Sequence, residues 1–132
     1  MRNPNNPCLF CNLKESGVAH ENKLAYASYD TYPVSDLHCL IIPKRHINSY
    51  FELTNEELIA CNELVKLIKD EILRKDKNVG GFNLGTNFGL IAGQSIMHCH
   101  IHLIPRRLGD VDNPQGGVRS VIPKKQHYIR KK

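Results

Sequence analysis

Apolar side chains recur at helical spacing in the middle of the chain. Between Thr54 and Lys75 they return every three or four positions, which is the period of a helix with one buried face. Thr54 and Glu57 occupy the two positions of an N-terminal capping box. The pattern predicts one long helix from about Thr54 to about Lys75. Its buried stripe is expected to contain Leu58, Cys61, Val65, Ile68 and Ile72.

Four short apolar runs have the length and the flanking turn residues of strands. They are Leu24 to Tyr29, His38 to Ile42, Phe82 to Asn87, and His98 to Ile104. Pro43 and Pro105 follow two of these runs, and proline cannot donate to a sheet ladder. Gly80 and Gly81 are expected to end the connection that follows the helix. Strands separated from one long helix predict an α+β fold in which the helix packs on one face of the sheet.

The last predicted strand carries histidine at every second position. It reads His98, Cys99, His100, Ile101, His102, Leu103, so the imidazoles share one face and the apolar side chains share the other. Neighbouring histidines on a face are roughly 6.6 Å apart and can share a metal ion, whereas the outer pair, at about 13 Å, would be strained. At least one imidazole is therefore expected to be free to act as a nucleophile or as a general acid and base.

Two cysteines near the N-terminus have the spacing of half a zinc site. Cys8 and Cys11 are separated by two residues, and two further ligands would complete a tetrahedron. A redox dithiol is the alternative, but that motif needs a preceding strand, and the pair stands too early in the chain. His46 and His98 are the candidates for the remaining ligands, with His20, His38 and His127 as alternatives that spacing does not exclude. We interpret the thiols of Cys39, Cys61 and Cys99 as buried in the core.

Length and composition restrict the class of protein. A chain of 132 residues, 23% of them charged, is expected to form one globular domain spanning 1–132, with roughly the last 20 residues as an irregular basic extension. No apolar leader and no run long enough to cross a bilayer are present, so we expect a cytoplasmic protein with reduced cysteines. The formal charge of +5 includes Arg106 and Arg107 at a strand end, where a phosphate-bearing substrate would be attracted.

The run His98-Cys99-His100-Ile101-His102-Leu103-Ile104 resembles the signature of the histidine triad (HIT) family. The resemblance covers almost the whole chain. It begins at the Cys8 and Cys11 pair, includes the segment from His38 to His46, and extends to Asp110. The segment from Asn113 to Arg119 resembles a tail of some microbial members, whose role the sequence does not give.

The resemblance implies the HIT-like fold, in which an antiparallel sheet with one long helix joins its counterpart across a homodimer. It also implies nucleotidyl hydrolysis or transfer by double displacement at an α-phosphate. His100, as the middle histidine, would attack phosphorus, and His102 would bind phosphate oxygens or assist proton transfer. A structural zinc would be held by Cys8, Cys11, His46 and His98, which agrees with the distance argument for the histidine strand.

The family pattern assigns five further positions to substrate binding. Asp30 corresponds to the residue that holds the ribose hydroxyls, although aspartate is also an ordinary turn former. Asn87 corresponds to a polar phosphate contact, and Gln94 and Ser95 lie in a loop that faces the phosphates and whose backbone N–H groups can form an anion site. His38 corresponds to a histidine near the active site, or is a structural residue at a strand end.

Three functions remain open on the sequence. A dinucleoside polyphosphate hydrolase is favoured slightly, because the basic residues after Pro105 could meet additional phosphates. A purine nucleoside phosphoramidate hydrolase uses the same motif residues. A zinc-stabilised nucleotide or nucleic-acid binding module with little turnover is the third. It is disfavoured because aromatic residues are not interleaved with the basic ones and because a binding module has no need of an unliganded His100.

Overall fold

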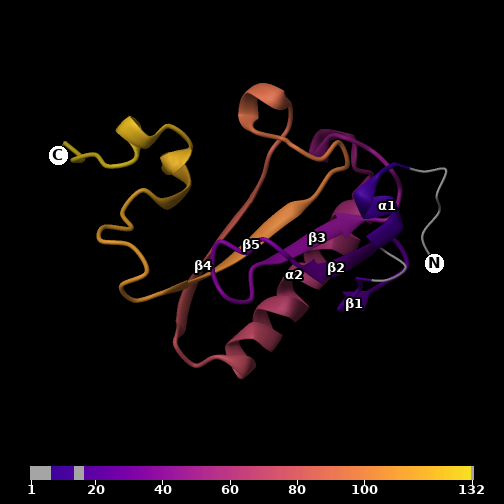
Figure 1. The fold of residues 1–132 in the computed structure, drawn as a ribbon, viewed down its shortest axis with the longest axis horizontal. Coiled ribbons are helices and arrows are strands. Elements are labelled where there is room, and N and C mark those ends of the chain that lie inside the picture. Colours follow the sequence, from indigo (N-terminus) through magenta and orange to yellow (C-terminus); the bar gives the residue numbers. More distant parts are fainter. Residues whose placement is uncertain (1–6, 14–16, 132) are drawn as a thin grey trace.

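The computed structural model describes residues 7–13 and 17–131, and most of these residues surround one antiparallel sheet (Figure 1). The first six residues, on which the expectation of no leader depends, lie outside the described part. The strands are β1 (His20–Glu21), β2 (Ala25–Tyr29), β3 (Cys39–Pro43), β4 (Val79–Thr86) and β5 (Ile101–Arg107). Their order is β1-β2-β3-β5-β4, so β1 and β4 form the edges. The predicted α+β class, with an antiparallel sheet and one long helix, is confirmed.

The long helix α2 (Asn55–Lys75) begins where the capping box predicted. The Thr54 hydroxyl accepts from the Glu57 N–H at 3.1 Å, and the Glu57 carboxylate accepts from the Thr54 N–H at 2.9 Å. The buried stripe differs slightly from the prediction, because it follows the i, i+4 row that starts at Ala60. Leu58 and Val65 are only half-buried. The described core of the helix contains Ala60, Cys61, Leu64, Ile68 and Ile72.

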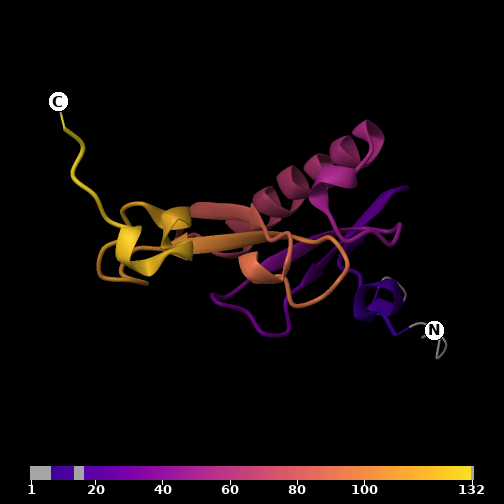
Figure 2. The same ribbon diagram turned by 90° about the horizontal axis from the view of Figure 1, so that it is seen from above.

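Helices cover both faces of the sheet, whereas the sequence predicted a helix on one face only. Figure 2 shows α2 on one side of the sheet and the short helix α1 (Leu9–Leu13) on the other. Alternating residues of the strands explain this: Ile41 packs in the α2 layer, and its neighbours Leu40 and Ile42 pack with Phe10 of α1. The three predicted core thiols, of Cys39, Cys61 and Cys99, are buried as expected. Burial raises the pKa of the Cys61 thiol to about 12, so it stays protonated at neutral pH.

The histidine strand begins three residues later than predicted and continues through Pro105. The backbone just before the strand bonds to the loop after β3 instead of to a neighbouring strand, because the Cys99 N–H donates to the Ile47 carbonyl at 2.6 Å. Pro105 is tolerated because β3 pairs with β5 only as far as Leu103. The Pro105 carbonyl instead accepts from the Ser35 hydroxyl at 2.7 Å, so this side of the strand lies beyond the ladder.

Strand β4 begins earlier than predicted and includes Gly80 and Gly81. The register against β5 shifts between Val79 and Gly81, which is the position of a bulge. Glycine tolerates such irregular backbone, so the pair bends the start of the strand rather than ending the connection. The two-residue strand β1 was not predicted, since a run of that length carries no periodic pattern.

The C-terminal segment, residues 111–131, lies at the end of the molecule opposite α1 (Figure 1). It contains two short 3-10 helices, η3 (Gly117–Val121) and η4 (Pro123–Lys125). Across residues 7–13 and 17–131, none of the helices combines the length and the apolar character that spanning a bilayer requires.

Candidate active site and metal centre

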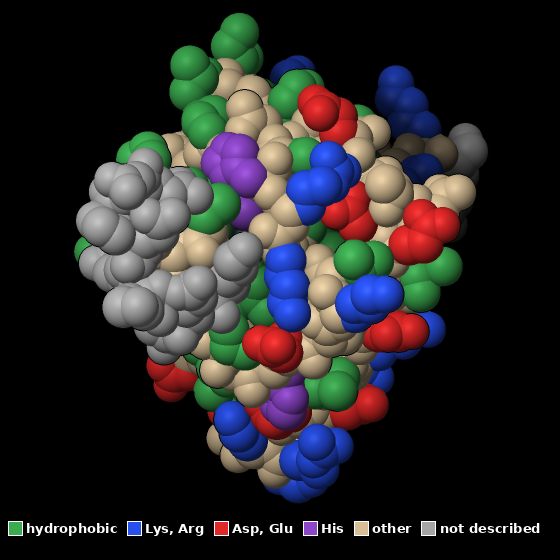
Figure 3. All heavy atoms as spheres, turned by 90° about the vertical axis from the view of Figure 1, so that its right-hand side faces the viewer, with side chains coloured by type: hydrophobic (Ala, Val, Ile, Leu, Met, Phe, Trp, Pro, Cys, Tyr) green, Lys and Arg blue, Asp and Glu red, His purple; other side chains and the backbone are tan. Residues whose placement is uncertain are grey.

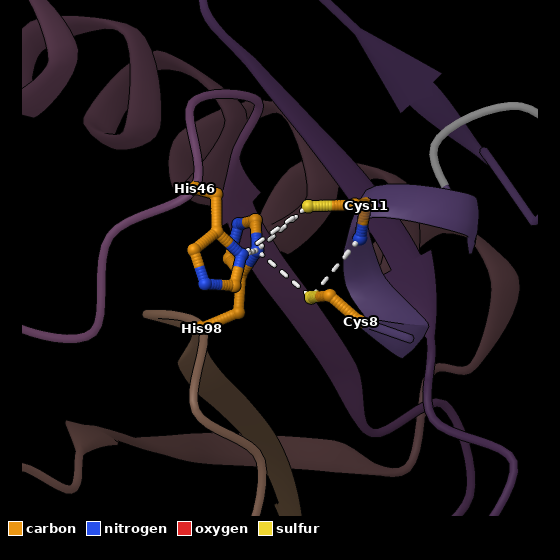
Figure 4. A group of neighbouring side chains, drawn as sticks. All are labelled: Cys8, Cys11, His46 and His98. Atoms are coloured by element: carbon orange, nitrogen blue, oxygen red, sulfur yellow. Dashed lines mark hydrogen bonds between the residues drawn. The ribbon is translucent and has the colours of Figure 1, made fainter. Parts of the chain in front are cut away.

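Two thiols and two imidazoles converge beside α1 (Figure 4). Cys8 and Cys11 come from the start of the chain, His46 from the loop after β3, and His98 from the loop before β5. The Sγ of Cys8 is 3.3 Å from Nδ1 of His98, and the Sγ of Cys11 is 3.3 Å from Nδ1 of His46. The two Nδ1 atoms are 3.2 Å apart. The structure thus brings together the four residues that were predicted to ligate zinc.

The protonation of His98 suits a metal ligand. Its Nε2 is 2.8 Å from the Pro43 carbonyl, which can only accept, so Nε2 carries the proton and Nδ1 presents its lone pair to the thiols. The four donor atoms lie within 4.8 Å of one another. Zinc bonds of about 2.0 to 2.3 Å require ligand separations of about 3.3 to 3.8 Å, so the donor set fits a zinc-sized tetrahedron.

The three histidines proposed as alternative ligands lie elsewhere. His20 bonds to Glu71, with Nε2 and Oε1 2.7 Å apart. The Nε2 of His127 lies 2.9 Å from the Asn113 carbonyl, and His38 pairs with His102. The convergence on one centre is therefore specific to the predicted set.

His100 is 7% exposed and is oriented by its own backbone neighbour. Its Nδ1 lies 2.8 Å from the His98 carbonyl, so Nδ1 donates and Nε2 carries the lone pair. The Phe10 ring packs edge-on against the imidazole, with centroids 4.8 Å apart. An unprotonated Nε2 on a fixed ring is the arrangement that a nucleophilic histidine needs.

A second chain of hydrogen bonds fixes His102. The Val34 N–H donates to Nδ1 of His38 at 3.1 Å, so His38 carries its proton on Nε2. That Nε2–H donates to Nδ1 of His102 at 3.0 Å, which leaves the proton of His102 on its own Nε2. The carboxylate of Asp30 is 3.7 Å from Nε2 of His38 and also caps a turn by accepting from the Tyr32 N–H at 2.9 Å. Asp30 therefore has the turn contact and also lies beside the histidines.

Burial keeps this pair of imidazoles neutral. Burial, together with the smaller effects of the neighbouring His100 and His38, lowers the pKa of His102 to about 4. Burial also lowers the pKa of His38, against a smaller opposing effect of the Asp30 carboxylate. At pH 7 both rings act as neutral donors and acceptors in the directions given above.

The loop between β4 and β5 carries the remaining predicted residues. The Gln94 side chain is 2% exposed, accepts from the Gly89 N–H and donates to the Asn48 and Ile96 carbonyls. These bonds assign the side chain to holding the loop in shape. Ser95 is exposed beside it, and Asn87 borders the pocket next to His102.

Sequence reasoning missed two residues that hold the site. The Thr86 hydroxyl donates to the His100 carbonyl at 2.6 Å, a contact that depends on the register of β4 against β5. Phe10 was considered only as a spacer between Cys8 and Cys11, yet its ring contacts His98 and His100. An apolar residue between two ligands carries no signal that separates these roles.

Three relatives with named activities are similar to this chain in sequence. An adenylylsulfatase, HINT3, of Arabidopsis thaliana is 38% identical over 80% of this chain and 55% of its own. The adenosine 5'-monophosphoramidase HNT1 of Saccharomyces cerevisiae is 34% identical over 76% of this chain and 63% of its own. An AP-4-A phosphorylase of Mycobacterium tuberculosis is 36% identical over 75% of this chain and 51% of its own.

Solved structures show the same fold. A HIT family protein from Bacillus subtilis has a TM-score of 0.72 at 31% identity, covering 80% of this chain and 77% of its own. A hypothetical histidine triad nucleotide-binding protein from Sulfolobus tokodaii has a TM-score of 0.71 at 38% identity, covering 77% of this chain and 70% of its own. The HIT domain pattern matches residues 13–109, which include the three histidines. The chain therefore belongs to the HIT family.

Proposed function

We propose that this protein is a nucleotidyl hydrolase or transferase that cleaves at the α-phosphate of an adenosine nucleotide derivative and releases a nucleoside monophosphate. The observation that carries the proposal is the tautomer of His100. Its Nδ1–H is donated to the His98 carbonyl and its ring packs against Phe10, so the lone pair lies on Nε2 of a ring that is held in place. The named relatives act on adenosine compounds that differ in the group attached to the phosphate, which supports the same reaction centre with different leaving groups.

The reaction proceeds by two displacements. Nε2 of His100 attacks the α-phosphorus, a P–N bond forms, and the bond to the leaving group breaks with its electron pair. Water then attacks the phosphorus, returns the electron pair to Nε2 and gives the monophosphate. The neutral His102 donates its Nε2–H to a phosphate oxygen, and Ser95 and Asn87 contact the other oxygens. Asp30 holds the ribose hydroxyls.

The test follows AMP release from adenosine phosphoramidate and from diadenosine tetraphosphate by the wild type and by His100→Ala. We expect the wild type to release AMP and the variant to fall to background, because the substitution removes the proposed nucleophile. A variant that retained most of its activity would exclude His100 as nucleophile. The preferred substrate distinguishes the phosphoramidate hydrolase from the dinucleoside polyphosphate hydrolase that the sequence favoured slightly.

A structural zinc, a homodimer and a cytoplasmic location belong to the same proposal. The zinc would be held by Cys8, Cys11, His46 and His98. It would link α1 to the loop after β3 and to the loop before β5. The dimer would form along β4, since this strand is at the edge of the sheet and its Leu84 side chain is 50% exposed. An open edge strand with an apolar side chain is a template for pairing with a second copy.

A nucleic-acid binding module is supported less well. The face drawn in Figure 3 intersperses acidic and basic side chains instead of gathering the basic ones into a patch. The basic residues at the end of β5 are also neutralised, since Arg106 pairs with Asp110 and Arg107 with Asp76. A phosphate backbone needs several unpaired cations along one track.

A further inference from the structure

The positive charge of the chain is concentrated at its C-terminal end. Residues 113–132 contain six of the 18 basic residues and none of the 13 acidic ones. Residues 1–112 contain the other 12 basic residues and all 13 acidic ones, so their formal net charge is −1. The charge of +5 for the whole chain therefore originates in one segment. A charge asymmetry of this kind indicates a surface that meets an acidic partner.

The cations of this segment are exposed and lie at one end of the molecule. The C-terminal segment is opposite α1, and the chain after η4 extends away from the sheet (Figures 1 and 2). Lys124, Lys125, Arg130 and Lys131 are exposed. Within residues 7–13 and 17–131, none of these four forms an ion pair, in contrast to the two arginines at the end of β5. Their charge is therefore available to a partner outside the chain.

Exposed apolar side chains accompany these cations. Val118, Val121, Ile122 and Ile129 are each more than half exposed, and Ile129 reaches 95%. The Lys125 N–H donates to the Ile122 carbonyl at 2.8 Å, so an apolar residue and a cation lie one turn apart at η4. Single exposed apolar side chains are common, but four within one short basic segment favour a partner that is partly apolar.

The C-terminal segment is held in shape by its own contacts. The Arg119 guanidinium donates to the Lys125 carbonyl at 2.8 Å and to the Gln126 carbonyl at 3.2 Å. The guanidinium carbons of Arg119 and Arg130 lie 4.5 and 5.4 Å from the centre of the Tyr128 ring. A surface that is already ordered loses little conformational freedom on binding, so its cations and apolar groups can act together.

The chemistry of the segment favours a lipid surface over a nucleic acid. A bilayer with anionic headgroups offers phosphates to the cations and an acyl boundary to the apolar side chains. Single-stranded nucleic acids need exposed aromatic rings on which the bases stack. Tyr128 is the one Phe, Tyr or Trp of residues 113–132, and its ring already contacts two arginines. The Nε2 of His127 lies 2.9 Å from the Asn113 carbonyl. Both rings are therefore engaged within the chain, whereas the isoleucines are exposed.

We propose that the C-terminal segment binds reversibly to membranes that contain anionic phospholipids. Lys124, Lys125 and Arg130 meet the headgroup phosphates, while Ile122 and Ile129 enter the boundary between headgroups and acyl chains. None of these five residues lines the pocket beside the proposed catalytic histidines. The surface is therefore separate from the proposed reaction centre, and its test does not depend on the proposed function. Such peripheral binding requires no membrane-spanning helix.

The test is cosedimentation of the full chain with vesicles of phosphatidylcholine, either alone or mixed with phosphatidylserine, at low and at physiological salt. We expect the wild type to bind the mixed vesicles only, and more weakly as salt rises. Each basic residue near an anionic surface is worth about fivefold in partitioning, so Lys124→Ala combined with Lys125→Ala should lower the partition coefficient about 25-fold. Ile129→Ser should lower it several-fold at either salt concentration, because apolar burial is not screened.

The matched control changes two exposed lysines elsewhere. Lys23→Ala combined with Lys66→Ala removes the same total charge and should leave most of the binding intact. An equal loss in both double variants would show that net charge alone acts, and the proposal would be wrong. It would also be wrong if the wild type bound neither kind of vesicle, or bound both equally.

Two further measurements identify a different occupant. Binding of a single-stranded oligonucleotide with the same dependence on Lys124 and Lys125, without binding of vesicles, would assign the segment to nucleic acid. Sedimentation velocity without vesicles should give the wild-type mass for the variant of these two lysines. A lower mass would assign the segment to contact with a second copy. Either result would overturn the membrane proposal, and circular dichroism establishes that each variant is folded.

Discussion

At the scale of single residues, the three triad histidines have the same side chain but three different environments. His98 donates to the Pro43 carbonyl and presents Nδ1 to the thiols. His100 donates to a backbone carbonyl, and His102 accepts from His38. Each tautomer is set by the partner of the opposite ring nitrogen. The three rings therefore differ in tautomer because each has a different hydrogen-bond partner.

His38 is predicted to control the protonation of His102. The His38 ring helps to bury His102 and thereby lowers the pKa of His102. Removing this ring by His38→Ala should raise the pKa of His102 from about 4 toward 6.5. NMR titration of the His102 ring protons measures the shift directly. His38→Gln keeps a donor for Nδ1 of His102 and should retain more activity than His38→Ala. An unchanged His102 titration in both variants would contradict the assignment.

At the scale of elements, α1 is too short to be stable as an isolated helix. Its five residues are held by the Tyr26 hydroxyl, which donates to the Phe10 carbonyl at 2.5 Å, and by the cluster of thiols and imidazoles. The position of Phe10 against His100 would therefore depend on the proposed metal centre. Zinc there would be coupled to the proposed nucleophile through one packed side chain.

Loss of a zinc ligand should release this element. We expect Cys8→Ser to remove bound zinc and to lower the thermal unfolding temperature, because the metal contributes its binding free energy to the folded state. Zinc is measured by elemental analysis of protein purified without chelator. Cys61→Ala serves as the control, since its thiol is buried in the core, and it should lose stability but keep zinc. Zinc-free wild type, or unaltered zinc in Cys8→Ser, would refute the site.

Helix α2 is tied to the sheet edge by one carboxylate. Glu71 accepts from the Tyr29 hydroxyl at 2.6 Å and pairs with His20 and Lys75. The bonds from Tyr29 and His20 lower the pKa of Glu71 from 4.5 to about 2. Its contribution to stability is therefore complete above about pH 4.5 and is lost as the pH falls toward 2.

Glu71→Ala should lower the free energy of unfolding by about 1 to 3 kcal/mol at pH 7, because the Tyr29 hydroxyl loses its acceptor. The difference from wild type should shrink as the pH falls from 4.5 toward 2. Urea unfolding at several pH values measures both effects. Glu63→Ala changes an exposed carboxylate of the same helix and should be nearly neutral. A Glu71→Ala penalty that did not depend on pH would show that the carboxylate acts through packing instead.

At the scale of the whole molecule, the sheet has an open edge beside the active site. Strand β4 bonds to β5 on one side, and the loop after it exposes Phe88, Leu90 and Ile91. The opposite edge is the two-residue strand β1, which offers little backbone for pairing. Apolar exposure thus accumulates on the edge where the homodimer is proposed.

The dimer is predicted to depend on this edge. Sedimentation of the wild type should give twice the chain mass of 15.0 kDa. Leu84→Asp places a charge on the edge strand and should shift the protein to monomer at micromolar concentration. Leu108→Asp, at an exposed position in the turn after β5, is the control and should leave the mass unchanged. A monomeric wild type would exclude the interface.

The sequence predicted the elements with strong local signals. The capping box determined the start of α2, and the alternation of imidazole and apolar residues indicated which side chains share a face. Boundaries were less accurate where tertiary contacts override local pattern. Pro105 looked like the end of a strand, yet β5 continues because that side of the strand lies beyond β3. The glycines at 80 and 81 looked like a turn, but they form an irregular strand start.

By itself, the sequence determined the family, the four candidate metal ligands and the candidate nucleophile, because residue type and spacing carry that information. Only the tertiary structure decided how those residues are used. The tautomer of His98 depends on the Pro43 carbonyl of β3, and that of His102 depends on His38 in the loop before β3. The tautomer of His100 depends on the His98 carbonyl, which the fold of the loop before β5 brings to its ring. The pairing of Arg107 with Asp76 likewise arises from a contact between segments far apart in the chain. A hydrogen bond or an ion pair needs two groups in place, and a linear pattern specifies only one of them at a time.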